Sequence, residues 1–427
     1  FNIVIIPQFI KNICMNKILK FLPRNIAKEN IVNPARLYNT NHLKKTSGKT
    51  IYLITRAFRA EDNFAFNYCF NKDKNFEIIF FIPQFELKQK QIFFETQMEF
   101  VKKTVENLNI NYHILTKSNE LFEFLNNEKT GHLIKDFNPL EDIKLPENKF
   151  QITEIDNHNI CPVRFISDKQ EYNAATLRRK IYNNIADFIT EYPPLNHFEN
   201  EAERTLKNFI EEHLPQYAEF KNNPVHDVTS GLSKYLNRGF ISGQRVFLEV
   251  LKSAAPDINK EVFFEELVIR QSLSDNFCLY CKNFKSFDCI PNWAKETLKT
   301  HSKDIRTHIY TPEELEEAET CDELWNASQN QLKAEGKIHG YMRMYWAKKI
   351  FEWTPSPQKA LEYAIYLNDK YAFDAPSSNG YTGILWSIGG LHDRPFADYP
   401  VTGKIRRMTC NGAKSKFDIN KYIERYI

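Results

Sequence analysis

The sequence predicts two domains, a Rossmann-like α/β domain on the N-terminal side and an all-α domain that takes up the second half of the chain. The 427 residues, 42% of them hydrophobic and 26% charged, suit a soluble globular protein of two or three domains. From Lys49 to about residue 165, short apolar runs alternate with amphipathic segments, which is the rhythm of a parallel sheet. From Glu201 onward the periodicity is helical, with almost no alternating β pattern.

The first domain, residues 49–165, consists in this prediction of buried strands joined by crossover helices. Residues 91–108 place apolar side chains at helical spacing and predict one such helix. Strands are predicted where apolar runs are too short for a helix, at 51–54, 77–82, 113–115, 131–134 and 151–154. Helices on both faces of such a sheet produce a doubly wound domain.

Residues 166–205 contain Pro193-Pro194 and many charges, and they predict an interdomain linker. The helical domain then occupies residues 206–427. The helices predicted from apolar spacing are 201–213, 242–253, 261–271, 312–319, 322–335, 338–353 and 357–369. No apolar run reaches the roughly 18 residues that a membrane-spanning helix needs, so we expect no membrane association.

The N-terminal extension, residues 1–48, is set apart by its charge. Residues 1–50 carry nine Lys and Arg against one acid, Glu29, whereas the other 377 residues carry 48 bases and 53 acids. Such a segment is typical of a mitochondrial transit segment, of a nucleic-acid-binding arm, or of sequence upstream of a start at Met15. We expect it to be poorly ordered, and the protein to be intracellular, in the nucleus, cytosol or mitochondrion.

The eight cysteines predict reduced intracellular thiols, because the sequence shows no signal peptide that would direct it to an oxidising compartment. Cys278, Cys281 and Cys289 have half the pattern of a zinc site. No second pair and no nearby His lies at zinc spacing. We therefore expect buried thiols here and no metal.

Five tryptophans stand out against 34 Phe and 20 Tyr. Trp346 and Trp353 are seven residues apart on one predicted helix, which leaves them about 20° out of line on a shared face. Trp325 lies on the preceding predicted helix and could pack beside them. A stripe of core aromatics explains this spacing, and so does an electron-hopping chain, which needs oxidisable rings in near contact.

Polar residues accompany the same helix. Arg343 requires a carboxylate partner if it is buried, and Asp374 is a plausible one, with Asn368 between them in sequence. Upstream, a run of hydroxyl and glycine residues precedes a predicted helix. This run, Thr229-Ser230-Gly231-Leu232-Ser233, suits a phosphate group but is also typical of an ordinary helix cap.

A basic cluster lies near the C-terminus. Lys404, Arg406, Arg407, Lys414 and Lys416 fall within thirteen residues. A solvated surface explains such a cluster, and so does a nucleic-acid-binding patch. The formal net charge of the whole chain, +3, makes no case for nucleic acid, so any such site must be local.

Together these motifs resemble the class II DNA photolyases, flavoproteins that use light to repair cyclobutane pyrimidine dimers. The resemblance extends from about Asn33 to Ile427. It implies the photolyase/cryptochrome architecture, with an α/β antenna domain followed by an all-α FAD-binding catalytic domain. The stretches that match the family pattern are 136–140, 156–159, 167–172, 336–370, 379–393 and 403–408.

The resemblance implies FAD as cofactor, with reduced FADH− as the active form. The isoalloxazine would lie beside an Arg343–Asp374 ion pair, and Asn368 would face flavin N5, where its amide could stabilise reduced flavin. Further implied cofactor residues are Lys221, Asn222, Thr229, Ser230, Gly231, Leu232 and Ser233. The wider superfamily also uses an antenna chromophore, 8-hydroxy-5-deazaflavin or a folate, but Arg56 and Arg59 match the first-strand pattern only in part.

Residues for electron transfer and repair follow from the same resemblance. Trp346 and Trp325 match the proximal and distal members of the photoreduction dyad, with Trp353 and Tyr310 as side branches. The implied catalytic residues are Glu266, Met344, Asn368 and Trp386. Glu266 would hydrogen-bond a thymine carbonyl, while Met344 and Trp386 would offer polarizable and flat contacts to the dimer.

The implied partner is UV-damaged DNA, double- or single-stranded, bound by a monomer. Arg394 and Phe396 would enter the space left by a flipped-out dimer, and Phe396 stands where the family has a tryptophan. The residues implied to bind phosphates are Lys404, Arg406, Arg407 and Lys414. Phosphate contacts are independent of sequence, which suits a protein that must find a lesion anywhere.

The sequence therefore predicts a carbon–carbon lyase in which photoexcited FADH− passes an electron to a flipped-out pyrimidine dimer. The alternative is a cryptochrome-like flavin photoreceptor that signals through a protein partner, and a third candidate is a flavin-free DNA-binding protein. Glu266, Met344 and Trp386 favour repair, because a sensor needs no lesion pocket.

Overall fold

The computed structural model describes residues 18–22, 27–28, 32–44, 47–192 and 200–427. These residues form two compact units. The sheet unit comprises the described part of 1–168 together with 175–218 and 230–272, and the helical unit comprises 169–174, 219–229 and 273–427. In the described residues, no helix is both long enough and apolar enough to cross a membrane.

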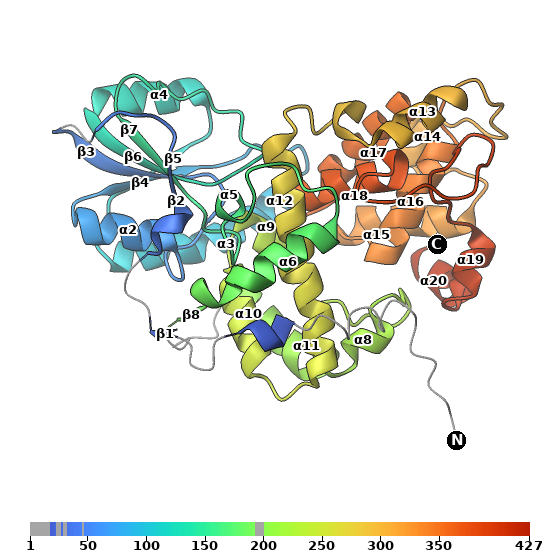
Figure 1. Ribbon diagram of the computed structural model, residues 1–427, viewed down its shortest axis with the longest axis horizontal. Helices are drawn as coiled ribbons and strands as arrows, with labels where there is room; N and C mark the ends of the chain where they lie inside the picture. The colour runs from blue at the N-terminus through green and yellow to red at the C-terminus, as the bar shows by residue number, and fades with distance from the viewer. Residues whose placement is uncertain (1–17, 23–26, 29–31, 45–46, 193–199) are drawn as a thin grey trace. The chain divides into compact units, whose positions relative to one another are not determined.

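The sheet unit is built on a six-stranded sheet with the order β2-β7-β6-β3-β4-β5 (Figure 1). All neighbouring strands are parallel except β2, which runs antiparallel to β7. The parallel strands are β3 (Lys49–Ile54), β4 (Glu77–Phe81), β5 (Tyr112–Leu115), β6 (Thr130–Asp136) and β7 (Gln151–Ile155). The predicted α/β fold class, with its parallel sheet, is confirmed.

Helices cover both faces of this sheet, which explains why most residues of its central strands are buried. Figure 1 shows α4 (Ser118–Asn127) on one face and α2 (Phe64–Lys72) on the other. Leu121 and Leu125 of α4 belong to one buried cluster with Ile51 and Leu133. The predicted crossover helix is α3 (Lys88–Asn107).

The sheet has an edge strand that the sequence did not predict. Residues 33–39, inside the segment expected to be a poorly ordered extension, form the short helix η2 (Pro34–Arg36) and strand β2 (Leu37–Asn39). Arg36 is buried, and its guanidinium donates hydrogen bonds to the carbonyls of Asp156, Asn159 and Ile160 at 3.1, 2.9 and 2.7 Å. Residues 1–17, with Met15, lie outside the described residues.

The segment predicted as a linker, residues 166–205, is more than a surface connection. It contains α6 (Ala174–Asn184), whose Leu177 and Ile181 are buried, and β8 (Thr190–Glu191), which pairs with β1 (Ala27–Lys28). Pro193-Pro194, on which the linker prediction rested, lie outside the described residues.

The other helices of the sheet unit follow the predicted order. The predicted helix 261–271 is longer than expected: α11 (Asp257–Phe264) leads directly into the π-helical segment η6 (Glu265–Arg270) and then into α12 (Gln271–Tyr280). The remaining helices here are α7 (Glu201–Asn208), α8 (Tyr217–Phe220), α9 (Ser233–Arg238) and α10 (Gly243–Lys252).

The helical unit confirms the all-α prediction for the C-terminal part of the chain. The helices α14 to α17 confirm the four predicted between 312 and 369, and α18 was not predicted as a helix. Their bounds are α13 (Asn292–Thr300), α14 (Pro312–Glu316), α15 (Glu323–Glu335), α16 (Gly340–Glu352), α17 (Pro357–Tyr371), α18 (Ser378–Gly389), α19 (Cys410–Lys414) and α20 (Ile419–Tyr426).

One expectation about cysteines is wrong. Cys281 and Cys289 form a disulfide rather than remaining reduced thiols. The turn after α12 brings their Cα atoms to 6.1 Å, within the range that a disulfide spans, and spacing along the chain does not show this turn. Cys278 is buried and belongs to no disulfide. Among the described residues, no group of three or more His, Cys, Asp or Glu side chains is arranged to hold a metal ion.

Candidate functional site

Helix α16 carries several of the predicted site residues, and its N-terminal end is fixed by the connection from α15 and by a cap. Gly336 ends α15 with a φ of +64°, and a Cβ there would lie 2.3 Å from the ring of Phe373, so glycine permits this tight connection. His339 caps α16, because its Nδ1 accepts a hydrogen bond from the Tyr341 amide at 3.2 Å.

The first group of predicted residues consists of an ion pair and a buried amide. Arg343 of α16 and Asp374, which follows α17, approach to 3.3 Å between Nη2 and Oδ1, and both side chains are partly buried. Asn368 of α17 is 3% exposed, and its Nδ2 donates a hydrogen bond to Asp369 Oδ1 at 3.1 Å. A partly buried guanidinium with a carboxylate partner can bind the polar edge of an aromatic cofactor, and a buried amide can do the same.

Several buried polar atoms of the helical unit have no hydrogen-bond partner within the described residues. Among them are Ser378 Oγ and Thr382 Oγ1, one turn apart on α18. Orphaned buried polar groups cost free energy, and a ligand rich in hydrogen-bonding atoms would satisfy them. These residues therefore fit a flavin dinucleotide.

The predicted phosphate-binding run is divided between the two units. In the helical unit, Thr229 Oγ1 donates to Asp227 Oδ1 at 2.6 Å and accepts from Lys337 Nζ at 2.7 Å. Sequence reasoning missed Lys337, which supplies a cation beside the predicted phosphate site. Lys221 and Asn222 lie in the turn after α8.

In the sheet unit, the run continues from Ser230 to Ser233. Gly231 has a φ of +67°, a conformation that glycine adopts without strain. The Leu232 amide donates to Ser230 Oγ at 3.3 Å, and Ser233 begins α9. Ser233 is exposed, whereas Leu232 is buried.

Three tryptophans form one ring stack. Trp325 lies between the other two, parallel to Trp346 with ring centroids 6.5 Å apart and edge-on to Trp353 at 5.8 Å. Trp325 Nε1 donates to the Trp346 carbonyl at 3.0 Å, and Trp346 Nε1 donates to Gln329 Oε1 at 2.9 Å. These hydrogen bonds hold the rings in contact, and Gln329 was not predicted.

Tyr310 extends this stack toward the surface. Its ring lies edge-on to Trp353 at 5.5 Å, and its backbone amide donates to the Trp353 carbonyl at 3.0 Å. The ring of His308 lies 6.1 Å beyond, nearly parallel. The aromatic chain, by which we mean Trp346, Trp325, Trp353 and Tyr310, is thus continuous from a buried ring to a partly exposed one.

A pocket of about 540 Å³ in the helical unit brings together five of the predicted residues. Its lining includes aromatic and sulfur-containing side chains and two arginines. The predicted residues among its lining are Met344, Trp386, Phe396, Arg406 and Arg407. Its volume and lining suit a bulky planar or near-planar group.

Two cations lie against the ring of Trp386. Lys348 Nζ is 4.6 Å from the ring centroid and donates to the Ser387 carbonyl at 2.9 Å. The Arg406 guanidinium is 5.5 Å from the same ring and 4.3 Å from that of Phe396. A lysine on a helix lies on a solvated face in most proteins, which is what the sequence alone suggests for Lys348, but the structure buries this residue, which is 2% exposed.

The predicted DNA-binding residues differ in whether their charge is already paired with a carboxylate. Arg406 makes a two-pronged ion pair with Asp393, both contacts being 3.0 Å, so its charge is already matched. Arg394 is exposed, with its guanidinium 5.3 Å from the Phe396 ring. Lys404 and Lys414 are exposed as well.

Glu266 lies in the π-helical segment η6 of the sheet unit and its side chain is exposed. Its neighbour Glu265 is buried in an ion pair with Arg178 at 2.6 Å. The two acids thus differ in burial: Glu265 is buried in an ion pair, whereas Glu266 is an exposed residue. Single-turn π segments inside helices are frequent at functional sites.

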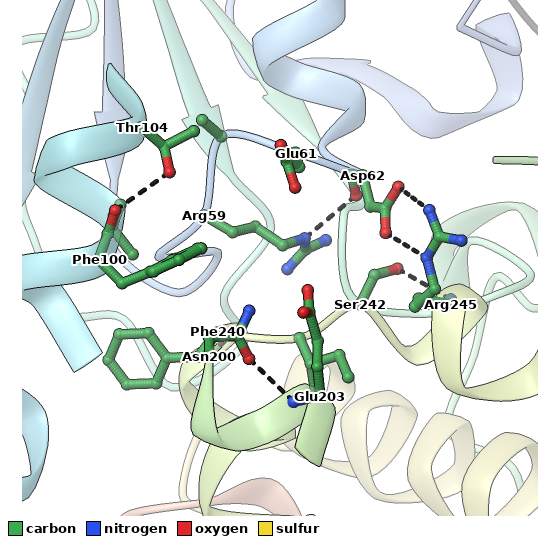
Figure 2. Close-up of a pocket in the computed structure, with 13 residues that line it drawn as sticks. Arg59, Glu61, Asp62, Phe100, Thr104, Asn200, Glu203, Phe240, Ser242 and Arg245 are labelled. Carbon is green, nitrogen blue, oxygen red and sulfur yellow. Dashed lines mark hydrogen bonds and ion pairs between the residues drawn. The ribbon is translucent and has the colours of Figure 1, made fainter. Parts of the chain in front are cut away.

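Figure 2 shows a second, much smaller pocket, of about 40 Å³, in the sheet unit. Asp62 pairs with Arg245 at 2.7 and 2.8 Å, while Arg59 Nε donates to the Asp62 carbonyl at 3.1 Å. Burial raises the pKa of Glu203 to about 7, and its Oε2 has no partner within the described residues. The pocket has room for a few water molecules, not for an aromatic chromophore.

Comparison with known proteins identifies relatives along most of the chain. A deoxyribodipyrimidine photo-lyase from Potorous tridactylus is 37% identical over 436 residues, which cover 89% of this chain and 82% of that protein. One from Arabidopsis thaliana is 34% identical over 443 residues, covering 89% of both chains. No protein-family model matches the chain.

Among solved structures, a class III photolyase from Agrobacterium tumefaciens has the same fold, with a TM-score of 0.66 over 91% of this chain and 88% of that one, at 13% identity. The predicted resemblance to class II photolyases is confirmed by the curated relatives. At their identity and coverage, this chain belongs to the deoxyribodipyrimidine photo-lyase family of the photolyase/cryptochrome superfamily.

Proposed function

We propose that the protein repairs cyclobutane pyrimidine dimers by light-driven electron transfer to a dimer flipped out of the DNA. One observation carries this proposal. Helix α16 presents Arg343 of the ion pair, Met344 of the large pocket and Trp346 of the aromatic chain within four consecutive positions. Cofactor, substrate and electron supply would therefore meet along a single rigid element.

FAD is the cofactor in this proposal, and its reduced form supplies the electron when it absorbs light. Arg343 and Asp374 would hold the isoalloxazine, and Asn368 would face N5. Thr229 with Lys337, and the run from Ser230 to Ser233, would bind the phosphates. The buried, unpartnered Ser378 Oγ and Thr382 Oγ1 of α18 support a polar ligand in the helical unit.

A pyrimidine dimer cannot reach a buried cofactor while it is stacked in a duplex, so it must be extruded, and damage lowers the energy that extrusion costs. Met344 and Trp386 would receive it, and Glu266 would hydrogen-bond a thymine carbonyl. Arg394 and Phe396 would fill the space left in the duplex. Exposed Lys404 and Lys414 would bind phosphates, with Arg407 beside them.

The aromatic chain would return the cofactor to its reduced form and would take no part in repair itself. Trp346 is the proximal ring, Trp325 the next, and Trp353 with Tyr310 the branch toward solvent. An antenna chromophore, 8-hydroxy-5-deazaflavin or a folate, would bind to the α/β domain and add only light harvesting.

The test is direct. The protein is purified, its absorption spectrum is recorded, and it is illuminated with an oligonucleotide that contains one thymine dimer, with a dark sample as control. We expect flavin absorption and recovery of two thymines by chromatography in the illuminated sample alone. A flavin-loaded protein that restores no thymine would support the photoreceptor alternative, and a colourless protein that takes up no added FAD would support a flavin-free DNA-binding protein. Either result overturns the proposal.

A further inference from the structure

The amide of Asn368 is held in one orientation by its neighbour in sequence. Asn368 Nδ2 lies 3.1 Å from Asp369 Oδ1. A carboxylate only accepts hydrogen bonds, so the NH₂ branch of the amide must be the one that faces Asp369. Helix α18 lies against the same branch, because a Cβ built on Gly380 would be 3.1 Å from Nδ2. The amide oxygen is therefore directed away from Asp369.

The orienting carboxylate is itself held. Tyr381 of α18 donates a hydrogen bond from its hydroxyl to the other oxygen, Asp369 Oδ2, at 2.7 Å. Tyr381 is 2% exposed, with the Phe284 ring at 5.3 Å and Lys285 Nζ at 4.9 Å from its own ring. A buried phenol packed against these neighbours has little conformational freedom. Its hydrogen bond therefore restrains Asp369, and Asp369 in turn restrains the Asn368 amide.

The orientation of this amide has a chemical consequence, which rests on the proposed function. Flavin N5 bears a hydrogen in the reduced state and only a lone pair in the oxidised state. An amide oxygen accepts a hydrogen bond from N5–H but repels a lone pair, whereas an NH₂ group would favour the oxidised state. An amide whose oxygen is held toward N5, away from Asp369, thus favours reduced flavin.

We propose that Asp369 and Tyr381 are positioning residues that hold the Asn368 oxygen toward flavin N5 and so raise the reduction potential of the bound cofactor. They act through Asn368 and touch neither cofactor nor substrate.

The test is the two-electron midpoint potential of bound FAD in the full-length holoprotein. In D369N, the new amide can also donate, so Asn368 is free to turn. Since one hydrogen bond is at stake, we expect about a tenfold fall in the ratio of reduced to oxidised flavin at a fixed potential, which is about 30 mV for this couple. Y381F should shift the potential the same way by less. The matched control is Y366F, which removes a surface tyrosine–carboxylate hydrogen bond of the same helix as Asn368, from Tyr366 to Glu316, and should leave the potential unchanged.

A double substitution separates positioning from a direct effect of the Asp369 charge. If Asp369 acts through Asn368, then D369N shifts the potential in the normal background and adds nothing in N368A. An equal shift in both backgrounds overturns the proposal, and so does an unchanged potential in D369N that binds FAD fully. Failure of the unsubstituted protein to bind FAD or to repair dimers would instead overturn the proposed function, so the two failures are distinguishable.

Discussion

Lys348 is an ammonium group buried beside the pocket that holds Met344 and Trp386. Its residue is 2% exposed, and burial lowers its pKa to about 7, with Asp393 and Glu352 opposing that shift. A lysine in this setting stays charged at neutral pH only in part. It therefore makes the folded state sensitive to pH.

The sign of this effect is testable with K348M. Between about pH 7 and the ordinary lysine value near 10.4, the unfolded chain binds more protons than the folded one, so this lysine makes folding more favourable as pH rises. K348M abolishes that dependence, so its free energy of unfolding should exceed that of the unsubstituted protein by the most at pH 7, and the difference should become clearly smaller at pH 9. Urea unfolding at both pH values measures this, with the adjacent K349M as control. A difference between K348M and the unsubstituted protein that is the same at both values contradicts the assignment.

Glu266 provides the second residue-scale prediction. A carboxyl at this position can stabilise the charge that develops on a thymine carbonyl, whereas it adds little to the binding of the whole lesion. E266Q should therefore lower the repair quantum yield several-fold and leave the dissociation constant for dimer-containing DNA nearly unchanged. Thymine recovery per absorbed photon and a binding titration test both parts. An unchanged quantum yield rejects this role.

At the scale of elements, α15 and α16 together carry the aromatic chain. Trp325 contacts both Trp346 and Trp353, so it is the link between the buried end and Tyr310. W325F preserves packing but inserts a ring that is far harder to oxidise. We expect light-driven reduction of oxidised flavin to slow by an order of magnitude or more, while protein reduced chemically beforehand repairs dimers normally. Loss of both activities in W325F would contradict a purely reductive role.

His301 and Asp304, which follow α13, form ion pairs and a hydrogen bond that connect the end of this helix with residues 398–401. His301 Nδ1 lies 2.6 Å from Asp304 Oδ2, and His301 Nε2 lies 2.8 Å from Asp398 Oδ1. Asp304 also accepts a hydrogen bond from the Val401 amide at 2.8 Å. The hydrogen bond to Asp304 is the main cause of a raised pKa for His301.

This arrangement predicts a defined pH dependence. Because the pKa in the folded state is raised, the contribution of His301 to stability is fully present below its unfolded value near 6.5 and is lost as pH rises through the folded value. H301N should therefore destabilise the protein most at pH 6 and least at alkaline pH. Denaturant unfolding across this range tests it, with the exposed His226→Asn as control. A loss that stays constant with pH would show that packing alone is involved.

At the scale of the whole molecule, DNA affinity should depend on a small number of free cations rather than on net charge. The formal net charge is only +3, and Arg406 is already paired with Asp393. Lys404 and Lys414 are exposed and are the simplest candidates for phosphate contacts.

Replacing both lysines by alanine should reduce the salt dependence of binding. Each phosphate contact contributes about 0.9 to the slope of log affinity against log salt, so the slope should become shallower by about 2. Fluorescence anisotropy with damaged duplex at several salt concentrations measures it, and K421A, of an ion-paired lysine on α20, is the control. Binding that is flat across salt in the unsubstituted protein would contradict phosphate recognition by this cluster.

Much of the fold was predictable because burial leaves a local trace in the sequence. Strands β3, β4 and β6 lie inside the sheet and read as short apolar runs. Strand β2 left no such trace, since it is a three-residue edge strand in a basic segment. Helix α18 was missed because its glycines weaken the helical signal, although Ser377 caps it.

The sequence by itself determined the fold class, the family and the helix that presents Arg343, Met344 and Trp346, because spacing along one helix places residues on its faces. Only the tertiary structure decided that Trp325 is the middle ring, that Arg406 is paired with Asp393, that Cys281 joins Cys289, and that Tyr381 reaches Asp369. These contacts join residues from different elements or across a turn, and their geometry depends on packing that no periodicity records.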